Sequence, residues 1–109
     1  MNIKELQKMI KDAEDFILKK MGKFQYSNLI RCLKAQEELG EVADVLIRIE
    51  VGSRKGKISP EEGKKELGKE IVDTIVPLIG LANFYNIDLD SIFEEKLKKD
   101  KERYKKVDF

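Results

Sequence analysis

The chain has 109 residues, which is enough for one compact domain and too few for two. Charged residues make up 39 % of it, but 22 Lys and Arg nearly cancel 21 Asp and Glu, so the net charge of +1 provides no overall attraction to nucleic acid or to an anionic membrane. The absence of His excludes Ser-His-Asp and Cys-His catalysis and His-based zinc sites, so any bound metal must have oxygen ligands.

The single cysteine, Cys32, rules out an intrachain disulfide and fits a reducing, cytoplasmic location. It lies in an apolar helical pattern, so we expect it to be a small core residue. The N-terminus is charged and unlike a signal peptide, and no apolar run approaches the ~20 residues that span a membrane. We therefore expect neither a membrane nor a nucleic-acid polymer as a partner.

The first predicted helix covers residues 3–20, where apolar residues recur at a spacing of three to four. Gly22 is expected to end it, since glycine readily adopts the left-handed conformation of a helix end. Phe24 and Tyr26 follow in a short connection. They either pack against the next helix or line a pocket.

The second predicted helix begins after a cap at Ser27 or Asn28. It contains the acidic stretch Glu37-Glu38-Leu39-Gly40-Glu41. Glu38 and Glu41 are three residues apart, so they share one side of the helix, at the edge of its apolar stripe. Carboxylates at the edge of a core are costly unless they are paired or bound to a metal.

The third predicted helix starts with Ser59 as its N-cap and Pro60 in its first turn. It carries a second carboxylate pair, Glu70 and Asp73, again three residues apart. Pro77 lacks a backbone N–H, so it is expected either to kink this helix or to split it in two.

The two acidic stretches have two interpretations. Brought together, they would supply four oxygen ligands for a hard cation such as Mg²⁺. The alternative is a pair of charged helix faces in solvent, the usual explanation for Glu-rich helices. Spacing alone favours the solvated faces, but the position of Glu38 and Glu41 at the edge of the apolar stripe favours the cation site.

The last predicted helix follows an N-cap at Asp88 and runs from Leu89 to about Lys105, with a thin apolar stripe and a strongly basic second half. The chain is thus predicted to be all-α, with four helices and no strand, in a single domain over residues 1–109. Several helices are longer than a small lone bundle needs, so we expect two chains to pair and complete the core.

The order of the motifs resembles a known family. Glu37-Glu38-x-x-Glu41 followed by Glu70-x-x-Asp73 is similar to the EExxE and ExxD signature of MazG-type nucleoside triphosphate pyrophosphohydrolases. The flanking segments EELGEVADVL, LANFYNIDL and KLKKDKERY resemble that family too, so the resemblance covers about residues 27–106. It implies a four-helix MazG-like bundle, and with the length of the helices we expect a homodimer or homotetramer.

The resemblance also implies an activity: hydrolysis of (deoxy)nucleoside triphosphates to monophosphate and pyrophosphate with Mg²⁺, with a role in clearing non-standard nucleotides. By position, the implied metal ligands are Glu38, Glu41, Glu70 and Asp73. Either Glu37 or Glu38 would orient or deprotonate the attacking water. The implied substrate-binding residues are Lys96, Arg103 and Asn83.

The chain departs from the family pattern in three places. Asp100 replaces an Asn in the final motif, Pro77 stands where an aromatic residue is common, and Phe24 and Tyr26 are the only substitutes for a base-stacking Trp. Two other functions stay open. One is a phosphoribosyl-ATP pyrophosphatase, a relative with similar helices. The other is a helical interaction protein that has lost catalysis, of which Asp100 and Pro77 would be signs.

Overall fold

The computed structural model describes residues 1–22, 27–52 and 56–105. In this part the chain forms four helices and no strand, which confirms the all-α prediction. The helices are α1 (Ile3–Met21), α2 (Asn28–Glu50), α3 (Pro60–Phe84) and α4 (Leu89–Arg103). None of these helices combines the length and the apolar composition that crossing a bilayer requires. The two interpretations of Phe24 and Tyr26 concern residues outside the described ranges.

The predicted N-caps of α2 and α3 and the predicted C-terminal end of α1 are confirmed, and α4 ends at Arg103, two residues before its predicted end. Ser27 is the cap of α2, since its hydroxyl oxygen accepts a hydrogen bond from the backbone N–H of Ile30 at 3.2 Å. Ser59 caps α3 in the same way. Gly22 ends α1 with φ of 81°, in the left-handed region that favours glycine. Hydroxyl caps thus satisfy backbone donors that the first turns of α2 and α3 leave without helical partners.

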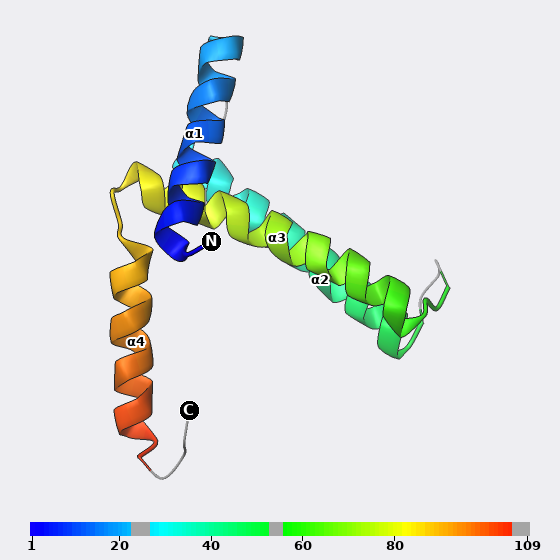
Figure 1. The fold of residues 1–109 in the computed structure, drawn as a ribbon. Helices are drawn as coiled ribbons and strands as arrows, with labels where there is room; N and C mark the ends of the chain where they lie inside the picture. The colour runs from blue at the N-terminus through cyan, green and yellow to red at the C-terminus, as the bar shows by residue number, and fades with distance from the viewer. Residues whose placement is uncertain (23–26, 53–55, 106–109) are drawn as a thin grey trace.

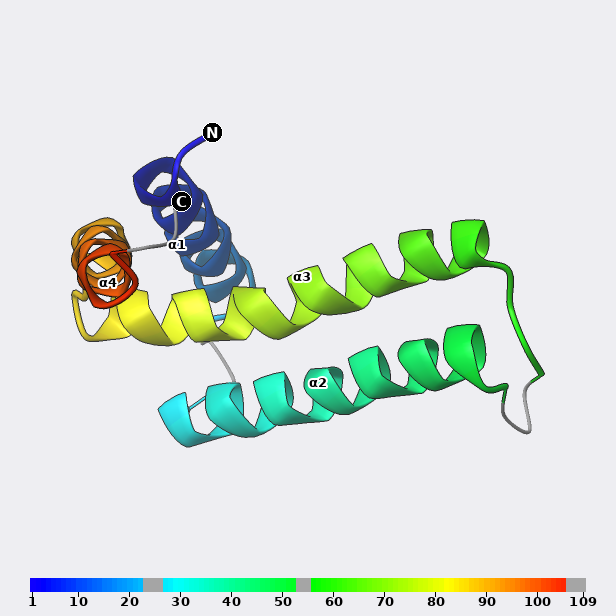
Figure 2. The ribbon, with the colours of Figure 1, turned by 90° about the horizontal axis from the view of Figure 1, so that it is seen from below.

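Helix α3 runs through Pro77 as one element (Figure 2). The alternative of two separate helices is therefore wrong. A proline inside a helix costs one backbone hydrogen bond, but α3 packs along α2 on both sides of that point, and this packing keeps the helix continuous.

Helices α2 and α3 lie side by side and antiparallel, and α1 crosses α3 towards its C-terminal end (Figures 1 and 2). Helix α4 begins beside α1 and extends away from the α2–α3 pair. One side chain ties these parts together. The amide of Gln7 on α1 donates to the side-chain oxygen of Asn83 at 3.0 Å and to the carbonyl of Ile87 at 2.9 Å. Its oxygen accepts from the N–H of Leu89 at 3.1 Å.

A buried ion pair joins α1 to α2. The guanidinium of Arg31 donates to both carboxylate oxygens of Glu14, at 2.5 and 2.7 Å. Arg31 is only 8 % exposed, so this bidentate pair offsets the cost of burying its charge. It lies directly against Gly80 of α3, where a Cβ would overlap both the Arg31 guanidinium and the Glu14 carboxylate. A glycine at this point of α3 therefore lets the ion pair fit.

The core of a single chain is small. The buried apolar side chains of the described residues are Ile10, Ala35, Val45, Ile79 and Ala82. Large apolar side chains stay exposed on each helix, among them Phe16, Leu33, Val72 and Leu97. The radius of gyration is 17.4 Å, against about 13 Å for a compact domain of this length. Cys32 is exposed as well, so its prediction as a core residue is wrong for the single chain, because the apolar side of α2 on which it lies is not covered.

Replacing Gly80 by alanine should destabilise the protein by about 1–3 kcal/mol, because the added methyl group must displace a buried ion pair. Gly68→Ala is the matched control. A Cβ there meets nothing within 4 Å, so alanine should stabilise the same helix by up to about 1 kcal/mol. Urea unfolding of both variants at one protein concentration measures the difference. Equal stability of the two variants would contradict the tight packing at Gly80.

Candidate metal centre

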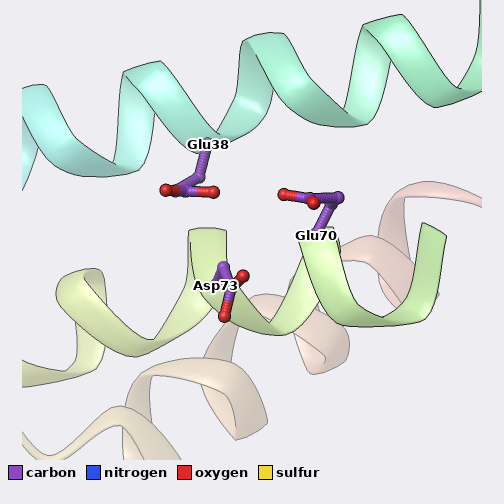
Figure 3. Close-up of side chains that lie close together, drawn as sticks. All are labelled: Glu38, Glu70 and Asp73. Atoms are coloured by element: carbon purple, nitrogen blue, oxygen red, sulfur yellow. The ribbon is translucent and has the colours of Figure 1, made fainter. Parts of the chain in front are cut away.

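Three carboxylates meet between α2 and α3. Glu70 and Asp73 are one turn apart on α3, and Glu38 faces them from α2 (Figure 3). One oxygen of each residue lies within 4.8 Å of the other two. Glu38 and Glu70 are partly buried and Asp73 is exposed. The antiparallel packing of the two helices thus brings together acids that lie more than 30 positions apart in the chain.

The electrostatics of this cluster are unfavourable without a cation. The pKa of Glu70 is raised above its ordinary value of 4.5, first by burial and then by its interaction with Glu38. The negative charges of Asp73 and Glu41 add to the effect. Desolvation and like charges both oppose ionisation, so a bound cation would relieve the repulsion.

The donor set fits a hard divalent cation. Mg²⁺ takes six oxygen ligands at 2.0–2.1 Å, so ligands on opposite sides of the ion are about 4.2 Å apart. The cluster oxygens lie within 4.8 Å of one another, and small side-chain rotations would close that difference. The three donors are all carboxylates, without the nitrogen or sulfur ligands that zinc and copper prefer. The remaining positions around the ion would be filled by water or phosphate oxygens.

Two further predicted site residues lie beside the cluster. Glu41 is exposed and is not one of the three residues that meet, yet its charge contributes to the raised pKa of Glu70. Glu37 is exposed, and its carboxylate lies 3.6 Å from the ammonium of Lys34. On α2, Glu37 directly precedes Glu38, and Glu41 follows it three residues later.

A comparison with family models identifies the domain. The MazG nucleotide pyrophosphohydrolase domain matches residues 24–108, which include both acidic stretches. The chain belongs to the MazG family. A search of curated proteins finds no match. The resemblance drawn from the sequence is therefore confirmed at the level of the family.

The MazG domain carries its two predicted phosphate-binding cations on α4. The ammonium of Lys96 is 2.5 Å from the carboxylate of Asp100, and the guanidinium of Arg103 lies 5.5 Å from the ring centre of Tyr104. Helix α4 packs on α1 and extends away from α2 and α3 (Figures 1 and 2). A single chain therefore does not bring Lys96 and Arg103 to the carboxylates.

Asn83, the third predicted substrate-binding residue, takes part in the packing of the MazG fold. Its side-chain oxygen accepts from Gln7, and its amide nitrogen donates to the Gln7 carbonyl at 2.9 Å. It also lines a cavity of about 630 Å³ between α1 and the start of α2. A direct contact of Asn83 with the nucleotide remains a prediction.

Sequence reasoning missed the groove that adjoins the carboxylates. A cavity of about 500 Å³ lies between α1 and the α2–α3 pair. Its lining combines apolar side chains with charged ones, among them Ile10, Ile17, Arg31, Lys34, Glu38, Asp73, Val76 and Pro77. The contact of Lys34 with the acids could have been predicted from the sequence, since Lys34 precedes Glu37 and Glu38 by three and four positions. The Glu14–Arg31 pair could not have been predicted in this way, because it depends on how α1 crosses the other helices.

Neutralising Glu70 should stabilise the metal-free protein. In the folded state the raised pKa means that Glu70 binds a proton more readily than in the unfolded chain, so its ionisation opposes folding. Glu70→Gln should therefore unfold at higher urea than the wild type at neutral pH. The difference should shrink as the pH falls through the raised pKa of folded Glu70 towards the ordinary value of 4.5, because the folded wild-type carboxyl takes up its proton before the unfolded one does.

Urea unfolding in the presence of a chelator, repeated over this pH range, measures the effect. Glu94→Gln, a neutralised acid on the exposed surface of α4, is the control and should change little. A Glu70→Gln protein less stable than the wild type at neutral pH would mean that the repulsion is already compensated without metal.

Proposed function

We propose that this MazG domain hydrolyses (deoxy)nucleoside triphosphates to monophosphate and pyrophosphate with Mg²⁺, and that it acts on non-standard nucleotides. The observation that carries the proposal is the meeting of Glu38 with Glu70 and Asp73 in a chain of the MazG family. A triphosphate would be repelled by bare carboxylates, so the substrate and the acids both need a cation between them.

The cluster residues would hold the ion, with Glu41 as a fourth ligand after a change of rotamer. When bound, Mg²⁺ supplies positive charge against the phosphates and makes nearby water more acidic. The chain's own residues position the phosphates and the water, which is most of what phosphoryl chemistry requires.

Glu37 is the better of the two candidates for orienting or deprotonating the attacking water. The carboxylate of Glu38 faces Glu70 and belongs to the cluster, so a metal ion would compete for its lone pairs (Figure 3). Glu37 is adjacent in the chain, and its side chain is 65 % exposed, so it can accept a proton while Glu38 serves as a ligand.

The groove beside the cluster is the proposed place of the nucleoside. Its apolar walls come from α1, with Ile10 and Ile17, and from α3, with Val76 and Pro77. Such walls suit the faces of a nucleobase, and Glu38 and Asp73, which also line the groove, suit a metal-bound phosphate.

We further propose that the chain forms a single domain that works as a homodimer or as a tetramer built from it. The exposed apolar side chains and the large radius of gyration support a partner that covers α2 and α3. A second copy would also provide a route by which Lys96 and Arg103 reach the phosphates, since the chain's own α4 extends away from its own carboxylates (Figure 1).

The decisive assay measures pyrophosphate release from a panel of standard and non-standard (deoxy)nucleoside triphosphates with and without Mg²⁺. Glu70→Gln and Glu41→Gln should each lower kcat/KM by at least about tenfold, since even indirect ligand supports contribute that much. Glu94→Gln should be unaffected. Turnover of phosphoribosyl-ATP but of no nucleoside triphosphate would identify the protein as a phosphoribosyl-ATP pyrophosphatase instead. The absence of any Mg²⁺-dependent turnover would indicate an interaction protein without catalysis.

A mixing experiment tests the shared site. Lys96→Ala and Glu38→Gln should each have little activity, and mixing them after partial unfolding should restore some of it, because a mixed dimer contains one complete site. Light scattering on the wild type should give at least twice the mass of one chain. A monomeric wild type, or no recovery from mixed dimers shown to form, would contradict a site built from two chains.

A further inference from the structure

A lysine stands at the edge of the carboxylate cluster. The ammonium of Lys34 lies 3.5 Å from a carboxylate oxygen of Glu38 and 3.6 Å from one of Glu37. The side chain of Lys34 is 41 % exposed, and that of Glu38 is 15 % exposed. Lys34 also lines the groove that contains Glu38 and Asp73. It therefore contacts both the cluster and the space where the substrate is proposed to lie.

Helix stabilisation is a weak explanation for this lysine. A pair at this spacing contributes about 0.2–0.5 kcal/mol, and the order with Glu before Lys is the better one. Here the lysine comes first, which is the poorer order. Its partner Glu38 is a partly buried member of a repelling cluster, so the positive charge mainly offsets the repulsion in the metal-free site.

We propose that Lys34 is a phosphate-binding residue of this site. Its ammonium pairs with Glu38 and Glu37 in the metal-free protein and with a substrate phosphate when the metal is bound. This inference rests on the proposed function. A cation at the carboxylates takes over the negative charge of Glu38 and repels the ammonium. The long, flexible lysine stem lets the ammonium turn into the adjacent groove, where the phosphates carry the compensating charge.

Lys34 also places a positive charge next to the cluster, which α4 does not do within one chain. Lys96 is engaged with Asp100, and its helix extends away from the cluster. Lys34 precedes Glu38 by one helical turn, about 6 Å along the axis, so it needs no second chain to reach the site.

The proposal predicts opposite effects on two ligands. In Lys34→Met, which keeps the apolar stem and loses the charge, Mn²⁺ alone should bind several-fold more tightly, because the competing ammonium is gone. Inorganic pyrophosphate in the presence of Mg²⁺ should bind roughly tenfold more weakly, because a charge-assisted hydrogen bond is lost. Lys34→Arg should restore pyrophosphate binding to within a few-fold of the wild type.

Calorimetry with Mn²⁺ alone and with magnesium pyrophosphate measures both affinities without any turnover. Lys8→Met is the matched control, since Lys8 makes the same kind of pair with Asp12 at 2.8 Å on α1, and it should change neither affinity. Thermal unfolding of each variant verifies that it is folded.

The outcomes separate the two proposals. A Lys34→Met protein in which both affinities fall, or in which neither changes, overturns the role of Lys34 while the wild type still binds metal and hydrolyses nucleotides. A wild type that binds no Mn²⁺ overturns the proposed function and the role of Lys34 with it.

Discussion

Repulsion among carboxylates that two packed helices force together is the constraint on which the site depends. Glu38 and Glu70 are partly buried and face each other across the α2–α3 interface, and Asp73 adds a third charge within reach. The raised pKa of Glu70 shows that folding opposes its ionisation. Packing energy from the rest of the two helices holds the acids in place, so their charge is available to attract a cation.

The position of α1 determines the shape of the space next to this cluster. The Glu14–Arg31 pair, seated against Gly80, joins α1 to the N-terminal end of α2, and the Gln7–Asn83 hydrogen bonds join it to the C-terminal end of α3. Glu14 and Arg31 line the groove together with Glu38 and Asp73. The groove thus combines these charged side chains with apolar side chains from α1 and α3.

The same arrangement leaves much apolar surface uncovered. Residues with helical periodicity, such as Leu33 on α2 and Leu97 on α4, are exposed in the single chain, and the molecule is more extended than a compact domain of its length. The hydrophobic effect favours covering such faces, and a second copy presents faces of the same kind. The proposed second copy would link assembly to the site, since Lys96 and Arg103 on α4 lie away from the carboxylate cluster of the same chain.

Local chemistry was enough to predict the helices, their caps at Ser27 and Ser59, and two carboxylate pairs on helix faces, because periodicity, capping and carboxylate spacing act over a few residues. The continuity of α3 through Pro77, the exposure of Cys32 and the contact of Lys34 with the cluster depended on which helix faces meet. Those outcomes follow from packing between distant segments. The sequence by itself determined which carboxylates share a helix face, and the tertiary structure decided which of them meet, because that depends on how α2 and α3 pack.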